Sequence, residues 1–188
     1  MRNRLLLIMG IALLALGVGL FAVLQFSASR GEKTSRQTVE KLLTLLPERW
    51  EGTPYADVDM PVLQMDGVDY VAILEIPSFG LTLPVANQWD GNGLFDAPAR
   101  FYGSCYGETF VVGGVDREYQ FAFCDKIENG TQIIVTDMTG AQFVYEVTRV
   151  ERSDRADGQW LIREEYPLTL FCRDTYSMEY IAVRCARS

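Results

Sequence analysis

The chain has 188 residues, of which 48% are hydrophobic and 12% aromatic, which is enough apolar area for the core of one domain. Its net charge of -8 argues against nucleic acid as a partner, because phosphate contacts need a clustered basic face. It contains no histidine, so every mechanism built on a Cys-His or Ser-His pair or on a histidine-ligated metal is excluded.

An uninterrupted apolar run of twenty residues extends from Leu5 to Leu24. As a helix it would be about 30 Å long, the thickness of a bilayer's hydrocarbon core. It predicts a transmembrane anchor within residues 1–27. A cleaved signal peptide is the alternative, since Arg2 and Arg4 give a basic start, but the apolar core of a signal peptide is only about 7–15 residues long. Basic residues flank both sides, so charge alone does not fix the orientation.

Residues 28–67 are predicted to be a linker that contains one short amphipathic helix. Apolar residues recur at helical spacing from Thr34 to Leu46, and Pro47 ends the pattern. We expect this helix to pack on the body of the domain. The remainder of the segment is irregular and acts as a connector.

From Val68 onward the sequence predicts a domain of short strands with little helix. The strand candidates are residues 70–76, 81–85, 99–104, 108–114, 132–136, 142–150, 168–172 and 180–185. The clearest hairpin joins residues 132–136 to 142–150 through the turn Asp137-Met138-Thr139-Gly140. Many short strands at regular spacing are typical of a closed barrel or a sandwich.

The last predicted hairpin, Pro167 to Ala186, carries the most specific pattern. It reads PLTLFCRDTYSMEYIAVRCA and resembles the C-terminal catalytic hairpin of sortases, the cysteine transpeptidases that join surface proteins to the Gram-positive cell wall, with class B and class D members as the nearest type. LEIPSFGLTLPV, from Leu74 to Val85, resembles the first two sortase strands. The resemblance covers about Val68 to Arg187 and implies a mainly β fold, a closed sortase-type β-barrel, for residues 68–188.

The resemblance also implies three catalytic positions, and none of them carries the family's residue. Aligned without gaps, Cys172 falls where the family has Thr, Arg173 where it has the nucleophilic Cys, and Tyr180 where it has Arg. Val115 stands where sortases have their catalytic His, after the apolar strand that ends in Gly114. The catalytic triad is therefore predicted to be lost within a sortase fold.

These losses remove the chemistry that the family needs. Sortases cut a Leu-Pro-X-Thr-Gly-like sorting signal after Thr and pass the acyl group to an amine of a wall precursor. A thiol attacks an amide only as a thiolate, the oxyanion of the intermediate needs a donor, and the departing amine needs an acid. The resemblance thus predicts a catalytically inactive protein, a pseudo-sortase.

Cys172 is the one candidate for a displaced nucleophile. It lies next to the nucleophile position, Arg173, Arg184 or Arg117 could lower its pKa, and Tyr180 could act as an acid. However, neighbouring residues on a strand point to opposite faces, so the sulfur should face away from the cleft unless a bulge turns it. An enzyme requires the Cys172 sulfur in the cleft, and a scaffold leaves it packed in the barrel wall.

The four cysteines allow three disulfide pairings if the domain is extracellular. The bridge between Cys105 and Cys124, which flank the strand 108–114, is the favoured pairing, and free buried thiols are the alternative. The other two cysteines are Cys172 and Cys185.

Neither a metal nor a cofactor is expected, because the chain lacks histidine and has no CxxC spacing. Four carboxylates are predicted to form a solvated acidic rim around the former cleft, and a cation site is the weaker alternative. These residues are Asp116, Glu118, Asp174 and Glu179.

The resemblance implies an N-terminus in the cytoplasm, a single-pass anchor and an extracellular domain. Two classes of function follow. One is a binding or scaffold protein at the cell wall, whose partner is a sorting-signal peptide, a wall precursor or an active sortase. The other is a divergent cysteine transpeptidase that uses Cys172. A decaying duplicate without a selected function is a third possibility.

Overall fold

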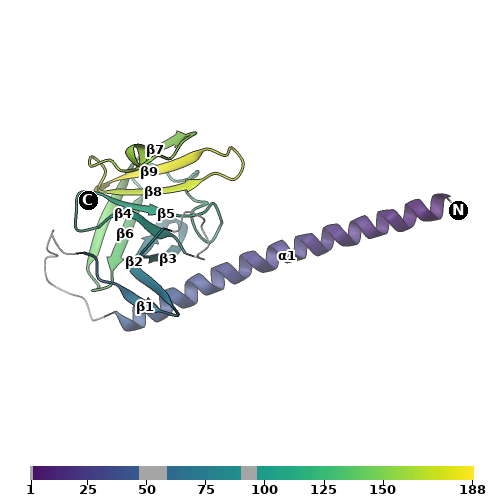
Figure 1. Cartoon of the computed structure of the whole chain (residues 1–188), viewed down its shortest axis with the longest axis horizontal. Coiled ribbons are helices and arrows are strands. Elements are labelled where there is room, and N and C mark those ends of the chain that lie inside the picture. The colour runs from purple at the N-terminus through teal and green to yellow at the C-terminus, as the bar shows by residue number, and fades with distance from the viewer. Residues whose placement is uncertain (1, 47–58, 90–96) are drawn as a thin grey trace.

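The structure, a computed structural model, describes residues 2–46, 59–89 and 97–188. Within α1 (Arg2–Leu45), side chains are described for residues 9–20 and 31–45. In the described part of the chain, nine strands form one curled sheet, and the long helix α1 extends from it (Figure 1). Most of the predicted connector, residues 47–58, lies outside the described residues.

The helix predicted from Thr34 to Leu46 is the end of the much longer helix α1. Ser35, Val39 and Leu42 are buried at helical spacing, so this end of α1 packs on the barrel as expected. The two helical segments of the sequence analysis are one helix. The residues between them include no proline, and Gly31 is the one residue among them with a low helix propensity. Gly31 itself lies under the ring of Tyr119, where a Cβ would overlap it.

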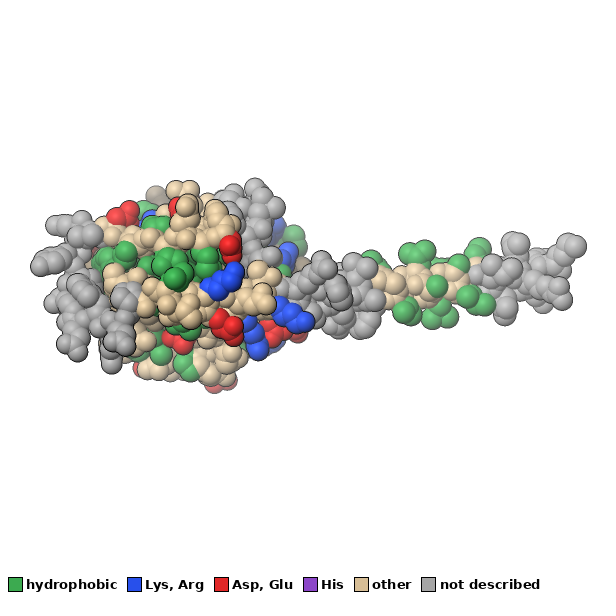
Figure 2. Space-filling model, turned by 90° about the horizontal axis from the view of Figure 1, so that it is seen from below, with side chains coloured by type: hydrophobic (Ala, Val, Ile, Leu, Met, Phe, Trp, Pro, Cys, Tyr) green, Lys and Arg blue, Asp and Glu red, His purple; other side chains and the backbone are tan. Residues whose placement is uncertain are grey.

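The other half of α1 extends away from the barrel, and its described side chains, residues 9–20, are exposed and largely apolar (Figure 2). Judged on the side chains that the structure describes, no helix is both long and apolar enough to cross a membrane. The side chains of residues 2–8 and 21–30 are not described, so part of the predicted span from Leu5 to Leu24 lies outside the described side chains.

The barrel closes through a pairing that is distant in sequence. The strands are β1 (Leu63–Met65), β2 (Val68–Ile76), β3 (Leu81–Ala86), β4 (Ala99–Gly103), β5 (Phe110–Gly113), β6 (Gln132–Asp137), β7 (Gln142–Ser153), β8 (Leu168–Arg173) and β9 (Tyr180–Arg187). They run in the order β1-β2-β3-β4-β5-β8-β9-β7-β6, and β6 pairs back with β2. Without β1, eight strands therefore form a closed ring, which confirms the barrel over the sandwich.

Alternation along the strands separates an inner from an outer face. Leu168, Leu170 and Cys172 of β8 belong to the apolar cluster inside the barrel. Phe171, between them, belongs to a second apolar cluster on the outer face, together with Val111. This second cluster also includes Leu161 from the connection between β7 and β8, so that connection packs on the outside of the barrel.

Three short elements were not predicted, and one of them is the 3-10 helix η1 (Pro77–Phe79) between β2 and β3. β1 pairs with the start of β2 through a two-residue turn at Asp66 and Gly67, both with positive φ, a type that Asp-Gly favours. The short helix α2 (Gly158–Leu161) begins at Asp157, whose carboxylate accepts a hydrogen bond from the backbone N–H of Trp160 at 2.8 Å. The Asp-Gly pair was a usable signal for β1, whereas a single helical turn gives no periodic pattern.

Gly103 and Gly67 both have positive φ, but only at Gly103 does another part of the backbone approach closely. Replacement by alanine should therefore destabilise the protein more at Gly103 than at Gly67. A Cβ at Gly103 would overlap the carbonyl oxygen of Thr109, whereas a Cβ at Gly67 would meet nothing within 4 Å. Gly67→Ala should lower the free energy of unfolding by about 1–2 kcal/mol, the cost of the left-handed backbone alone. Gly103→Ala should cost at least about 1 kcal/mol more, since the backbone must also shift. Urea unfolding of both variants tests this, and equal losses would contradict it.

Candidate functional site

The structure brings the three positions that correspond to the catalytic residues to one end of the barrel. β5 and β8 are parallel, and the backbone N–H of Gly114 donates to the carbonyl of Phe171 at 2.9 Å, which extends their pairing beyond β5. Val115 follows directly. Arg173 at the end of β8 pairs with Tyr180 at the start of β9.

Arg173 and Tyr180 contact each other on the outer face and not on the inner one. The guanidinium carbon of Arg173 lies 5.6 Å from the centroid of the Tyr180 ring. Its Nε donates to the carbonyl of Met178 at 3.1 Å, within the same hairpin. Arg173 therefore braces its own hairpin.

Cys172 points into the barrel, as strand alternation predicts for a residue next to the outward-facing Arg173. It is 2% exposed, and its Sγ donates a weak hydrogen bond to the carbonyl of Phe121 at 3.7 Å. It is one of the residues that line a cavity of about 830 Å³ at the barrel mouth, which we call the mouth cavity; Arg117 and Tyr176 also line it. Neither Arg173 nor Tyr180 lines this cavity.

All four cysteines are free and buried, so the predicted bridge between Cys105 and Cys124 is wrong. The two residues lie at opposite ends of β5, whose four residues span about 10 Å, and a disulfide reaches only about 7 Å between Cα atoms. Burial and the charge of Asp137 raise the pKa of the Cys105 thiol to about 12. Cys124 instead lies beside Cys172, and burial together with a hydrogen bond to that thiol raises its pKa.

The predicted acidic rim holds the tip of the β8–β9 hairpin in place. The Asp174 carboxylate accepts the backbone N–H groups of Tyr176 at 2.8 Å and Ser177 at 3.1 Å, and these bonds lower its pKa to about 2. Asp116 accepts the N–H of Thr175 at 2.9 Å. Across the part of the chain that the structure describes, no group of three or more cysteine or carboxylate side chains could hold a metal ion.

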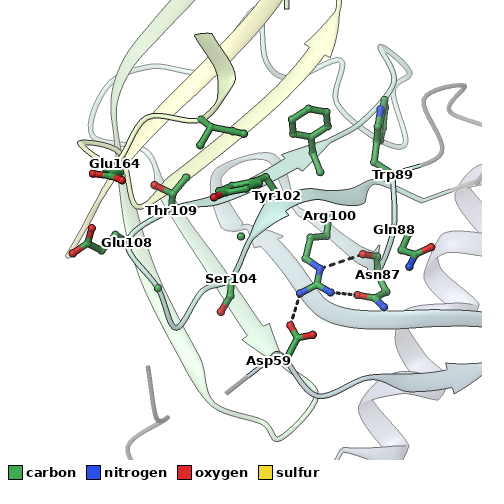
Figure 3. A pocket seen from close by; sticks show the side chains of 14 residues that line it. Asp59, Asn87, Gln88, Trp89, Arg100, Tyr102, Ser104, Glu108, Thr109 and Glu164 are labelled. Atoms are coloured by element: carbon green, nitrogen blue, oxygen red, sulfur yellow. Dashed lines mark hydrogen bonds and ion pairs between the residues drawn. The ribbon is translucent and has the colours of Figure 1, made fainter. Parts of the chain in front are cut away.

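A second cavity, of about 870 Å³, opens on the outer face beside β4 (Figure 3). We call it the outer groove. Its aromatic lining comes from Trp89, Phe101 and Tyr102, of which Tyr102 is 49% exposed. Glu108 and Glu164 are exposed on its rim, and neither pairs with a cation among the residues that the structure describes.

Arg100 is the cation of the outer groove, and its charge is already engaged (Figure 3). Its Nη1 contacts Asp59 at 2.9 Å and lowers the pKa of that carboxyl. Its Nε and Nη2 donate to the backbone and side-chain oxygens of Asn87, at 3.2 and 2.5 Å. The sequence analysis did not single out these groove residues, because an arginine or a tyrosine in a strand gives no sign of the loops that will surround it.

An aromatic cluster covers the outer face of β8 just before Arg173. The Phe171 ring lies 5.5 Å from Trp89 and 5.3 Å from Phe101, measured between centroids. Gly113 of β5 lies under this cluster, and a Cβ there would meet both Phe171 and Trp89 at 2.8–2.9 Å. The outer groove therefore borders the aromatic cluster that lies next to Arg173.

Arg184 fixes the wall of the site between β7 and β8. It is fully buried on the outer face of β9, and its guanidinium binds Glu151 at 3.1 Å, the carbonyl of Leu161 at 2.9 Å and the hydroxyl of Thr169 at 3.1 Å. It also donates to the carbonyl of Trp160 and lies 5.2 Å from the centroid of that ring. Burial lowers its pKa, and the charge of Glu151 opposes that shift.

The sequence matches the family model of the sortase domain over residues 74–184, which is more than half of the chain. The chain belongs to the sortase family. This confirms the resemblance on which the sequence analysis relied, and the family is one of cysteine transpeptidases. No curated protein is significantly similar to this sortase in sequence.

Solved sortase structures share its fold at low sequence identity. Sortase A from Corynebacterium diphtheriae is 19% identical with a TM-score of 0.55, over 86% of this chain and 84% of that chain. A sortase D5 transpeptidase of Clostridium perfringens is 18% identical with a TM-score of 0.54, over 64% and 79%. Sortase A of Listeria monocytogenes is 16% identical with a TM-score of 0.55, over 63% and 87%. At these identities the likeness concerns the fold.

Two of the three arginines that pair with Glu151 should differ in how much they stabilise the fold. Arg184→Met leaves the Glu151 carboxylate, 12% exposed, without its buried partner, and should lower the free energy of unfolding by about 3–5 kcal/mol. Arg149→Met removes a 64% exposed partner of the same carboxylate and should cost less than about 1 kcal/mol. Chemical denaturation of both variants measures the difference. A loss below 1 kcal/mol for Arg184→Met would mean that the network does not hold the wall.

Proposed function

We propose that this sortase is catalytically inactive and acts as a binding or scaffold protein at the outer side of the cell membrane, a pseudo-sortase. The observation that carries the proposal is the division of Cys172 and Arg173 between the two faces of β8. The thiol is buried inside the barrel, and a cation occupies the outward position that the family gives to its nucleophile.

No other group supplies the missing steps. The chain has no histidine to protonate a leaving amine, and Val115 stands at that position. The guanidinium of Arg173 is engaged by the Met178 carbonyl and Tyr180, and it has no nucleophilic character. Loss of the nucleophile alone costs another hydrolase on the order of 10⁶ in rate.

The outer groove is the binding site that we assign to the scaffold. It has a volume of about 870 Å³, it presents Trp89 and Tyr102 for apolar contacts, and its rim carries the exposed carboxylates of Glu108 and Glu164. Because Arg100 is paired with Asp59, the free charge of the rim is negative. This favours a partner with an amine, such as a wall precursor, over an anionic partner; a sorting-signal peptide or an active sortase would use the same groove.

The location is part of the same proposal. The apolar run from Leu5 to Leu24 is long enough to anchor the chain, and α1 continues from it to the barrel without a break. By analogy with sortases that are anchored in this way, the N-terminus is cytoplasmic and the barrel lies outside the membrane.

One observation favours a second candidate, a divergent transpeptidase. Cys172 lines the mouth cavity, whose walls include Arg117 and Lys126, so its thiolate would have cations nearby. In that case the acyl group would be carried within the barrel mouth and not in the outer groove.

The two candidates predict opposite behaviour of Cys172. For a pseudo-sortase, incubation of the full-length chain with a sorting-signal peptide should give no acyl adduct at Cys172 and no peptide cleavage. Alkylation of the native thiol should be roughly a hundredfold slower than in the denatured chain, because it requires local opening. Mass spectrometry of Cys172 measures both. A thioester at Cys172 that disappears on adding an amine would establish the transpeptidase instead.

If the partner binds in the outer groove, its affinity should depend on Tyr102 and not on Tyr176. Tyr102→Ala should weaken binding of an amine-bearing wall peptide about tenfold, the loss typical of an exposed aromatic anchor. Tyr176→Ala removes a side chain that is 96% exposed at the hairpin tip and should leave the affinity unchanged. Titration calorimetry with the full-length chain measures the affinities. Equal effects of the two variants would place the ligand elsewhere.

A further inference from the structure

We infer that Cys124 and Cys172 form a dithiol site that small disulfides oxidise to an intramolecular disulfide. The inference concerns a covalent modification inside the barrel mouth and does not depend on the partner proposed above. It also gives a role to a pair of thiols that the loss of the triad leaves unexplained.

Three observations place the two cysteines side by side. The carbonyl of Phe121 accepts the backbone N–H of Cys124 at 3.0 Å and the Sγ of Cys172 at 3.7 Å. The Cys172 thiol is also one of the neighbours that raise the pKa of Cys124, after burial. Both residues belong to the same buried cluster, so two segments nearly fifty residues apart in sequence meet there.

The remaining thiols are not placed to compete. Cys185 lies on the inner face of β9 opposite Leu168, four residues from Ile181, which is opposite Cys172, so the two sulfurs are about 13 Å apart along the strands. Cys105 lies at the other end of β5, where the guanidinium of Arg187 binds its carbonyl at 2.6 Å. The geometry therefore favours Cys124 over Cys185 and Cys105 as the partner of Cys172.

The mouth cavity gives a reagent access to one thiol of the pair. Cys172 lines this cavity of about 830 Å³, whereas Cys124 does not line it and has no exposed surface. When the barrel mouth opens locally, a small disulfide in the cavity therefore reaches Cys172 first, and Cys124 is then reached by Cys172. The order of the two steps follows from this arrangement.

In the first step, the deprotonated sulfur of Cys172 attacks one sulfur of the reagent, RSSR. This forms a mixed disulfide at Cys172 and releases one thiolate, which takes up the proton that Cys172 gave to solvent. In the second step, the deprotonated sulfur of Cys124 attacks the Cys172 sulfur and expels the second RSH. The protein loses two thiol hydrogens, and RSSR becomes two RSH. The second step is slow at neutral pH, because burial raises the pKa of Cys124, and the first step is slow because Cys172 is only 2% exposed.

Oxidation would tie the wall of the mouth cavity to the barrel. The wall is the turn from Arg117 to Ile127, which is held by its own backbone hydrogen bonds and by the Phe121 ring packed on Gly114. A bond from Cys124 to Cys172 fixes this turn to β8 and removes the free thiol from the cavity.

Trypsin separates the four cysteines, which makes the pairing directly readable. Cys105 lies in the fragment 101–117, Cys124 in 118–126, Cys172 in 164–173 and Cys185 in 185–187. The reduced full-length chain is incubated with oxidised glutathione, the remaining thiols are alkylated, and the digest is analysed without reductant. We expect fragments 118–126 and 164–173 to be joined, to separate on reduction, and to be accompanied by an upward shift of the unfolding midpoint.

Matched variants test the order of the steps. Cys124→Ser should stop the reaction at a glutathione adduct on Cys172, and Cys185→Ser should leave the joined fragments unchanged. The wild-type digest decides the outcome even if a variant does not fold. A bridge to Cys105 or Cys185, or a native chain that forms no bridge while retaining reactive Cys172, would overturn the inference. An acyl adduct at Cys172 would overturn the proposed pseudo-sortase and leave the bridge untouched.

Discussion

Arg184 holds a full positive charge on the outer face of β9 beneath the connection between β7 and β8. An isolated buried charge is prohibitive, so the site exists only because Glu151, two backbone carbonyls, a threonine hydroxyl and the face of Trp160 surround it. The connection from β7 to β8 must follow the path that supplies these partners. This path also forms one wall of the outer groove. Trp160 and Leu161 bind Arg184 through their carbonyls, and Ile162 and Glu164, which come shortly after them in the chain, line the groove.

The interior and the exterior of the barrel place different demands on β8. Closure requires that Leu168, Leu170 and Cys172 fill the interior, whereas the outward positions are free to change. Of the outward residues, Arg173 braces the hairpin, and Phe171 packs on Trp89 and Phe101. The sortase fold therefore places few demands on which residues stand at the outward positions of this strand.

The sequence predicted the elements whose apolar residues recur with a regular spacing. It did not predict the features that depend on contacts between residues far apart in the chain. Strands β2 to β9 and the inward direction of Cys172 follow from alternation and turn chemistry. The burial of Arg184 does not, since an arginine in a strand is normally exposed and nothing local announces the turn of helix that covers it. The Cys105–Cys124 bridge failed for a related reason: proximity in sequence on either side of a strand means separation in space. The outer groove could not be predicted either, because it forms only where three connecting segments lie side by side.

The position of β9 has a consequence for how the chain reaches its fold. This strand, the last in sequence, lies between β8 and β7, and the earliest strand of the ring, β2, pairs with β6. Until β9 is present the sheet has two open edges and the interior remains wet, so cooperative closure must wait for the final strand. Folding dominated by such non-local pairing is slow. A chain that is made from its N-terminus therefore cannot close this barrel before β9 has been synthesised.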